Sequence, residues 1–299
     1  KGWYSIRDIT RDSENAKIFY ISYYKRCDEN KWKMSFFKTK VENFDVEFID
    51  FVDLDPFSDE HCVSNPEGTH SGGRIINFDQ DNLLVTVGDW TKSSPQVDNS
   101  IYGKIIKVKK TGEDYKIFSK GHRNPQGLTM FNKELIFSSE HGHEGGDELN
   151  KIIENKNYGW PKVSYGTQYD YDEDGKAYEI SHENNQFQEP LFALVPSVGI
   201  SALNTCPSKL KIYYKKPCLL ALSLHGNSLR PGKSIIIYLL DEKMNQVHSI
   251  EKIYLRDHLK LRHFVTNSKN ELYEDRDGNI YFSADRQGIY KLSFIKFRN

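Results

Sequence analysis

Three polar loops concentrate residue types that suit catalysis better than strand interiors. In the first, GTHSGGR at Gly68–Arg74, His70 precedes two glycines that let the backbone turn tightly or approach a ligand. The strand predicted after this loop ends at Gly88 and Asp89. A carboxylate at that strand end could orient an imidazole for proton transfer, so His70 is a candidate general base. The alternative interpretation is an exposed turn histidine.

The second loop is GHRNPQGL at Gly121–Leu128, which is dense in planar hydrogen-bonding groups. Arg123 offers a rigid fork for carboxylates, and the amides of Asn124 and Gln126 can bind carbonyl or carboxylate oxygens. These groups flank the rigid Pro125, an arrangement that favours a ligand rich in such oxygens. A merely solvated turn is the alternative.

The third loop is SSEHGHEGGDELN at Ser138–Asn150, where glycines are interspersed with acidic residues. Carboxylate oxygens on a flexible backbone suit a hard cation such as calcium. The two histidines of the loop could indicate zinc, but no third nitrogen or sulfur ligand is evident, so calcium is preferred. A further acidic segment, Asp170–Gly175, begins like an EF-hand loop. The twelfth position of such a loop should hold a bidentate glutamate, but it is Ser181 here, so a solvated loop is favoured.

The elements that must position these loops are predicted to be strands. Short alternating segments rich in aromatic and β-branched residues recur, several after Asp-rich turns, and aromatic residues make up 13% of the chain. No stretch sustains helical periodicity for three turns. The spacing of the segments is typical of propeller blades. We therefore expect an all-β fold, with residues 1–299 as a single domain and 165–190 as a loop insertion.

Charge and composition exclude some classes of function. The chain has 41 Lys and Arg against 42 Asp and Glu, which argues against nucleic-acid binding driven by net charge. No apolar run approaches the ~18–20 residues needed to span a membrane. The four cysteines show no metal-binding spacing; partly buried thiols are favoured, with one or two disulfides as the alternative. These cysteines are Cys27, Cys62, Cys206 and Cys218.

Taken together, the motifs HSGGR, GHRNPQGL, EHGHEGGDELN, NYGWP and VPSVGISAL occur in the order found in soluble quinoprotein sugar dehydrogenases. The sequence resembles the glucose/sorbosone dehydrogenase family, particularly its aldose sugar dehydrogenase branch, from about Trp3 to Phe297. The resemblance implies a six-bladed β-propeller with pyrroloquinoline quinone (PQQ) and calcium at the mouth of the central channel. It also implies a sugar substrate, an external electron acceptor, and a periplasmic or secreted location; no signal peptide is visible.

The resemblance also implies roles for individual residues. His70 would take the proton from the anomeric hydroxyl while the C1 hydride moves to the quinone, and Asp89 would orient His70. Arg123 would lie close to the reacting quinone oxygen, and Asn124 and Gln126 would contact the cofactor.

For calcium, the resemblance implies two sites. The backbone carbonyls of Gly142 and His143 would face the cofactor's ion, and Glu148 and Tyr158 would match a second, structural ion.

Several positions depart from the family pattern. Two arginines one residue apart that clamp the PQQ carboxylates correspond here to Lys260 and Arg262, followed by His263 instead of aspartate. His225 stands at the position of a cofactor-binding lysine, and Trp3 at that of a glutamine.

Lysine keeps the charge of the clamp but loses the bidentate fork, so weaker PQQ binding is expected. The chain also begins where the family's first blade is already under way. These departures leave two alternatives: a non-enzymatic propeller that binds a protein or glycan, as Hedgehog-interacting protein does, and a hydrolase or lactonase on the same scaffold.

Overall fold

The computed structural model describes residues 6–41, 48–64, 69–90, 94–168, 178–224, 233–255 and 259–294. Trp3, His225 and the acidic segment 170–175 lie outside the described residues. Within the described ranges, no helix is both long enough and apolar enough to cross a membrane.

Five antiparallel sheets make up the described structure, and the strands of each sheet are neighbours in chain order. The first sheet comprises β1 (Ile6–Arg11), β2 (Ile18–Arg26), β3 (Trp32–Val41) and β4 (Phe48–Asp53). The second comprises β5 (Gly72–Asn77), β6 (Asn82–Val87), β7 (Lys104–Lys109) and β8 (Tyr115–Lys120). The third comprises β9 (Pro125–Asn132), β10 (Leu135–Glu140), β11 (Asp147–Ile152) and β12 (Phe192–Leu194).

The fourth sheet comprises β13 (Ile200–Thr205), β14 (Cys218–Ser223), β15 (Ser234–Leu240) and β16 (Val247–Tyr254). The fifth has three strands: β17 (Leu261–Phe264), β18 (Ile280–Ala284) and β19 (Gly288–Leu292). Helical turns are short: η1 (Asp59–His61), η2 (Ser94–Gln96), η3 (Glu183–Asn185) and α2 (Ser208–Tyr214). The all-β prediction is confirmed.

Asp-rich turns connect two of the hairpins, as the sequence predicts. Asp79 Oδ1 accepts the backbone N–H groups of Asp81 and Asn82, at 2.9 and 2.8 Å. Asp275 does the same for Asp277 and Asn279, both at 2.9 Å. A short carboxylate that bonds its own backbone stabilises a tight turn, which fixes the register of the strands that follow.

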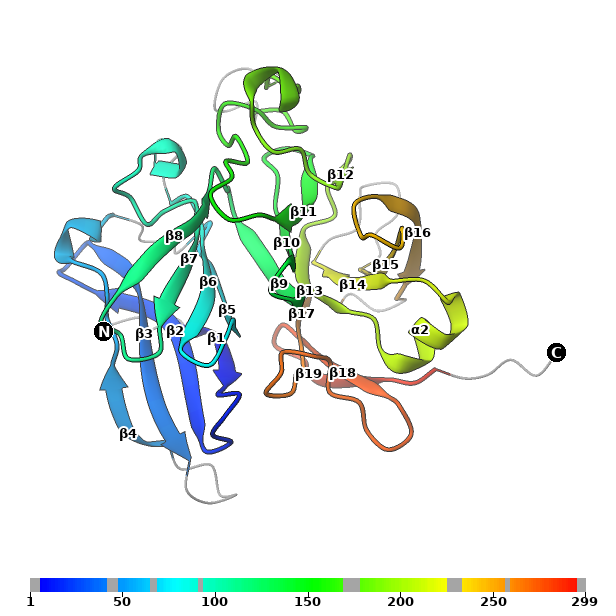
Figure 1. Ribbon diagram of the computed structural model, residues 1–299, viewed down its shortest axis with the longest axis horizontal. Helices are drawn as coiled ribbons and strands as arrows, with labels where there is room; N and C mark the ends of the chain where they lie inside the picture. The colour runs from blue at the N-terminus through cyan, green and yellow to red at the C-terminus, as the bar shows by residue number, and fades with distance from the viewer. Residues whose placement is uncertain are drawn as a thin grey trace.

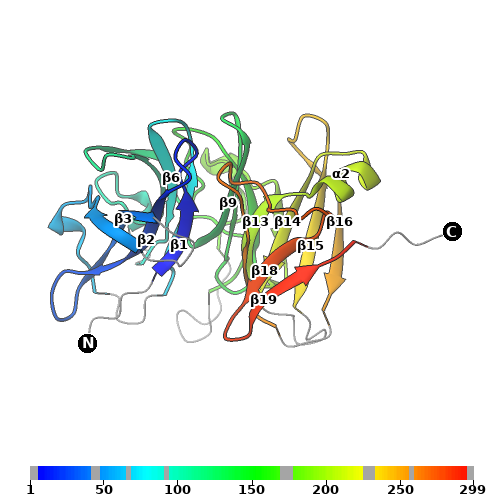
Figure 2. The same cartoon turned by 90° about the horizontal axis from the view of Figure 1, so that it is seen from below.

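The sheets succeed one another around their first strands, like the blades of a propeller (Figures 1 and 2). An apolar cluster fills the space between each pair of consecutive sheets. Representative residues, from the first to the last interface, are Phe36 with Val85, Leu84 with Ile136, Phe137 with Leu219, and Leu220 with Phe282. Face-to-face packing of sheets removes most of their apolar surface from water and holds the first strands in place.

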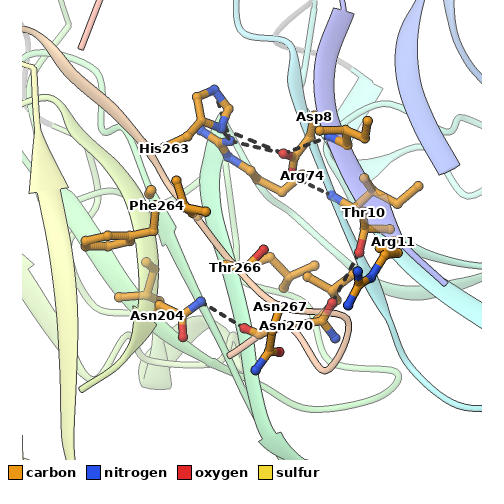
Figure 3. A pocket seen from close by; sticks show the side chains of 18 of the residues that line it. Asp8, Thr10, Arg11, Arg74, Asn204, His263, Phe264, Thr266, Asn267 and Asn270 are labelled. Atoms are coloured by element: carbon orange, nitrogen blue, oxygen red, sulfur yellow. Dashed lines mark hydrogen bonds and ion pairs between the residues drawn. The ribbon is translucent and has the colours of Figure 1, made fainter. Parts of the chain in front are cut away.

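The prediction of six blades is wrong, because the described residues form five sheets. A four-stranded sheet with its loops takes a stretch such as residues 72–120, and the described residues provide four such sheets and one of three strands. A cavity of about 640 Å³ lies among the first strands of the sheets and is lined by residues of β1, β5, β9, β13 and β17. Figure 3 shows this cavity, with Asp8, Arg74 and His263 at one end and Asn204 and Asn270 at the other.

Asn270, in the loop between β17 and β18, connects the last sheet to three of the others. Its side-chain oxygen accepts hydrogen bonds from Thr10 Oγ1 at 3.3 Å and Asn77 N at 3.2 Å, and its Nδ2 donates to Asn77 O at 3.0 Å. Asn204 Nδ2 donates to the Asn270 carbonyl at 2.9 Å. This buried residue therefore joins the fifth sheet to β1, β5 and β13 (Figure 3).

We predict that Asn270→Gly lowers the free energy of unfolding by about 2–4 kcal/mol, since three buried side-chain hydrogen bonds are lost. Asn270→Ala should cost about 1 kcal/mol more, because the backbone of Asn270 is left-handed, with φ 62°. Chemical denaturation measures both. Asn155 is also left-handed (φ 64°) but exposed, so Asn155→Gly is the control. Equal losses at both positions would contradict the bridging role.

All four cysteines form disulfide bonds, Cys27–Cys62 and Cys206–Cys218. The preferred prediction of partly buried thiols is therefore wrong. The second bond joins the residue after β13 to the first residue of β14, where the two strands are paired. Cysteine spacing alone does not predict this pairing, because the register of the two strands brings the partners together.

Candidate functional site

The loops that carry His70 and Arg123 precede the first strands of the second and third sheets, and Asp89 follows β6. Strands β5 and β6 are paired, which brings His70 and Asp89 to the same end of the sheet. The crossing of the two segments requires glycine at Gly88: a Cβ there would lie 1.7 Å from the His70 carbonyl oxygen. The His70 backbone is left-handed, with φ 49°, an uncommon conformation for a non-glycine residue.

His70, Asp89 and Arg123 form one hydrogen-bonded group. His70 Nδ1 lies 2.9 Å from Asp89 Oδ1, and Arg123 Nη2 lies 3.0 Å from His70 Nε2. Because a guanidinium can only donate, Nε2 must carry a lone pair while Nδ1–H donates to Asp89. Asp89 is buried, whereas the His70 side chain is 36% exposed. This is the arrangement of a positioned base that a ligand can reach.

Arg123 is held from several sides. Its Nη1 donates to the His141 carbonyl at 3.2 Å, and its guanidinium lies 5.4 Å from the centre of the Trp160 ring. Its backbone N–H donates to Glu140 Oε2 at 2.8 Å. Arg123 Nε is buried and has no hydrogen-bond partner among the described residues. This donor is available to an acceptor supplied by a ligand.

Asn124 and Gln126 connect the loops to one another. Asn124 Oδ1 accepts the Gly72 N–H at 3.2 Å and Gln126 Nε2 at 2.7 Å, while the Asn124 carbonyl accepts the His141 N–H at 3.1 Å. Asn124 is buried and Gln126 is partly exposed. The three loops singled out by the sequence thus meet at one end of the ring, and the roles of these two amides toward a cofactor stay predictions.

The glycine-rich loop does not fold as a carboxylate cage. Asp147 Oδ1 accepts the Gly142 N–H at 3.1 Å, and Asp147 Oδ2 accepts the N–H groups of Val198 and Ile200 at 2.9 and 3.0 Å. The described residues contain no group of three or more His, Cys, Asp or Glu that could hold a metal ion. Any calcium here would therefore have to rely on backbone carbonyls. The carbonyl of Gly142 accepts no hydrogen bond among the described residues, so it fits that role.

The His143 side chain points elsewhere: Nδ1 lies 2.8 Å from Tyr178 Oη. Only the backbone of His143 is therefore relevant to the predicted calcium site, as the resemblance implied.

Glu148 and Tyr158 are not joined by a hydrogen bond in the part of the chain that the structure describes. Tyr158 Oη bonds to the Lys151 carbonyl and the Ile153 N–H, and its ring stacks on His122. Glu148 receives a hydrogen bond from Asn150 Nδ2 at 3.1 Å. Burial and the neighbouring Glu140 raise the pKa of Glu148 well above its usual range. The role of Glu148 and Tyr158 toward a second calcium stays a prediction.

Lys260 and Arg262 lie at the start of β17, at the same end of the ring as His70 and Arg123. Arg262 Nε forms an ion pair with Asp285 Oδ1 at 2.6 Å, which occupies part of its fork. Lys260 is exposed, and no ion pair with another described residue engages it. No hydrogen bond joins either side chain to the His70 group within the described ranges, so their clamp role stays a prediction.

His263, which replaces an aspartate of the family pattern, contacts Arg74 Nη1 at the wall of the cavity (Figure 3). Burial, and then the charges of Arg74 and Arg262, lower the pKa of His263 well below its ordinary 6.5. Below about pH 6.5 the unfolded chain therefore binds a proton that the folded protein does not. Asp8 Oδ1, 3.7 Å from His263 Nδ1, is the acidic group that faces it.

We predict that the stability of the wild-type protein falls between about pH 6.5 and pH 5, and that His263→Asn reduces this slope. The difference in slope between wild type and His263→Asn should be modest, because 36% of the His263 side chain is exposed to solvent. Denaturation curves at several pH values measure it. His248→Asn, at an exposed position on β16, is the control and should leave the slope unchanged. Parallel curves for wild type and His263→Asn would contradict the prediction.

Sequence reasoning missed two residues that hold the site. Trp160 donates its indole N–H to Asp89 Oδ2 at 2.7 Å, and Glu140 accepts hydrogen bonds from His122 Nδ1 and Asn150 Nδ2 at 3.1 and 2.7 Å. Both lie in motifs that the sequence had singled out, NYGWP and EHGHEGGDELN. The partner of Trp160 follows β6 of the second sheet, so spacing along the chain carried no signal for that contact. The partners of Glu140 lie on the neighbouring strand β11 and in the loop before β9.

Comparisons with known proteins agree with the fold. The sequence pattern described as glucose/sorbosone dehydrogenase matches residues 7–289. The aldose sugar dehydrogenase YliI of Escherichia coli K12 is 32% identical over 117 residues, which cover 34% of this chain and 32% of that protein. The chain thus matches about a third of the length of its curated relatives.

Solved structures resemble the whole chain more fully. A glucose dehydrogenase superposes with a TM-score of 0.77 at 22% identity, covering 100% of this chain and 84% of that one. The PQQ-bound aldose sugar dehydrogenase of Streptomyces coelicolor gives 0.63 at 16% identity, with 94% and 74% covered. At these identities the likeness shows the β-propeller fold alone. The family match, however, covers nearly the whole sequence, and the chain belongs to the glucose/sorbosone dehydrogenase family.

Proposed function

We propose that this protein is a PQQ-dependent dehydrogenase that oxidises the anomeric carbon of an aldose. The observation that carries the proposal is the His70–Asp89–Arg123 group, in which a partly exposed imidazole presents a basic nitrogen beside a guanidinium. A quinoprotein relative, glucose dehydrogenase B of Acinetobacter calcoaceticus, is 28% identical over 126 residues, which supports the same class of chemistry.

The residues present fit PQQ, which is rich in carboxylate and carbonyl oxygens. Arg123 Nε is a buried donor without a described partner, and Lys260 is an exposed cation with no described ion pair. Together with the amide of Gln126 they would hold the cofactor; His225, outside the described residues, is a further proposed contact. When bound, PQQ would supply the acceptor for the hydride from C1.

The chain's own residues would handle the proton. His70 Nε2 would accept it from the anomeric hydroxyl, whose oxygen then forms the carbonyl of the product. Asp89 would stabilise the imidazolium that results, since it already accepts the Nδ1–H. To expose the Nε2 lone pair, Arg123 must give up its hydrogen bond to His70. The released N–H would then be available for the negative charge that develops nearby.

Calcium is part of the proposal through backbone atoms. The carbonyls of Gly142 and His143 would face an ion bound with the cofactor, and the unbonded Gly142 oxygen supports this assignment. Such a site is weak without the cofactor, because it lacks a described cluster of carboxylates.

A periplasmic or secreted location is also proposed. Disulfides persist in oxidising compartments and are rare in the cytosol, and both pairs of cysteines are bonded here.

The test is reconstitution of the purified protein with PQQ and calcium, followed by reduction of an electron-accepting dye with a panel of aldoses. We expect turnover that needs both the cofactor and a sugar with a free anomeric hydroxyl. If PQQ binds and no aldose reduces the dye, the dehydrogenase assignment fails. In that case the alternative of a non-enzymatic propeller that binds a protein or glycan gains support.

A further inference from the structure

We propose that Trp160 is a positioning residue that fixes the tautomer of His70 and the place of Arg123 at once. The proposal deepens the proposed function, because it concerns the same proton-accepting group. Trp160 lies in the loop after β11, far along the chain from both His70 and Asp89. It is buried, with 5% of its surface exposed.

The first contact is made by the indole N–H. Trp160 Nε1 donates to Asp89 Oδ2 at 2.7 Å, while Asp89 Oδ1 faces His70 Nδ1 at 2.9 Å. Each oxygen of the carboxylate thus has its own side-chain donor. The indole can only donate, so it holds the carboxylate in one rotational position and leaves Oδ1 aimed at Nδ1–H. A carboxylate that is held in this way favours the tautomer with its lone pair on Nε2, the nitrogen that Arg123 contacts.

The second contact is made by the indole ring. The Arg123 guanidinium lies 5.4 Å from the ring centre, within the range of a cation–π interaction. The same guanidinium reaches His70 Nε2 at 3.0 Å. Trp160 therefore touches the partner of each nitrogen of the His70 ring and does not touch the ring itself through any described hydrogen bond.

Trp160 is itself anchored well enough to act as a fixed point. The backbone N–H of Trp160 donates to the Gly121 carbonyl at 3.0 Å, and the backbone carbonyl of Trp160 accepts a hydrogen bond from Gln96 Nε2 at 2.6 Å. The Tyr178 ring packs 5.2 Å from the indole on another side. Because Gly121 directly precedes the segment that carries Arg123, the anchor and the site belong to one rigid unit. Small shifts of such supports are known to reduce catalysis strongly.

The test uses nitrogen NMR of the cofactor-free protein, with the His70 signals assigned by comparison with His70→Ala. In the wild-type protein we expect His70 mainly as the Nδ1–H tautomer. Trp160→Phe keeps an aromatic ring but removes the donor, and should give a mixture of tautomers. Replacement of Trp160 by benzothienylalanine keeps the shape of the indole but removes its N–H. This variant tests the loss of the donor even if Trp160→Phe does not fold.

Trp90→Phe is the matched control. Trp90 follows Asp89 directly in the sequence, but its ring packs on Tyr24 and Tyr102. We expect this variant to retain the wild-type tautomer of His70. If the two Trp160 variants also retain it, the proposal is overturned.

In the reconstituted enzyme, loss of the Trp160 donor should lower kcat by about ten- to a hundredfold with little change in KM, as for loss of a buried hydrogen bond to a charged group. Unchanged kcat in both Trp160 variants would overturn the positioning role. The two hypotheses fail separately: if the protein oxidises no aldose, the proposed function fails, while the tautomer measurement still decides the role of Trp160.

Discussion

His70→Ala is expected to lower kcat for aldose oxidation by about 100- to 10 000-fold, the range typical for removal of a positioned general base. The affinity for PQQ should change little, because His70 bonds to Asp89 and Arg123 and is not among the proposed cofactor contacts. Steady-state kinetics with a dye acceptor measure the first quantity, and absorbance titration with PQQ measures the second.

Two controls make this result specific. His248→Ala, on the exposed face of β16, should behave as wild type. Imidazole added to His70→Ala should restore part of the activity, because the cavity left by the side chain can admit a free base. Simultaneous loss of PQQ binding and turnover in His70→Ala would contradict the assignment of His70 as a base, since it would indicate a structural or cofactor-binding role.

Arg123→Met is expected to have the next largest effect, a loss of kcat of about 100- to 1000-fold, as for removal of one preorganised donor to developing charge. Methionine keeps much of the packing against Trp160 but supplies no donor to His70 Nε2 or to the His141 carbonyl. Unlike His70→Ala, this variant should also bind PQQ more weakly, because Arg123 Nε is a proposed cofactor donor.

Arg123→Lys separates charge from geometry. Lysine keeps the positive charge but lacks the planar fork that reaches both His70 Nε2 and the His141 carbonyl. We expect it to recover part of the PQQ affinity and little of kcat. Wild-type kcat in Arg123→Met would contradict a role for the guanidinium in the reaction.

The sequence predicts His70, Asp89 and Arg123 better than the residues that support them. His70 precedes β5 and Asp89 follows β6. Because two consecutive strands joined by a tight turn pair as a hairpin, the two residues come together at the same end of the sheet. The loop at Arg123 is equally readable, since four planar polar groups around a proline are rare in a solvated turn. The all-β class follows from alternation and aromatic content.

Contacts between blades could not be predicted in the same way. The partner of Trp160 is Asp89, in another sheet, and Asn270 bonds to residues of three other sheets. Neither contact leaves a periodic mark in the sequence. The number of blades could not be predicted from the pattern alone, because the strands are short and the loops irregular in length. The resemblance implied six blades, whereas the described residues form five sheets.

The glycine-rich loop gives a different lesson. Its acidic residues predicted a carboxylate-bound calcium, but Asp147 is committed to three backbone N–H groups that shape the loop. A carboxylate in a tight loop has two uses, binding a cation or capping amides, and composition does not distinguish them. The choice is made by tertiary contacts, here the approach of Val198 and Ile200.

The most direct measurement of the central claim is product analysis after a single turnover. The protein is loaded with PQQ and calcium, freed of excess cofactor, and mixed without oxygen or dye with an aldose that the dye assay identifies. We predict lactone or aldonic acid in an amount equal to the bound PQQ, and essentially none from His70→Ala on the same time scale. Absence of product from the loaded wild-type protein, or equal product from protein without PQQ, would contradict the account.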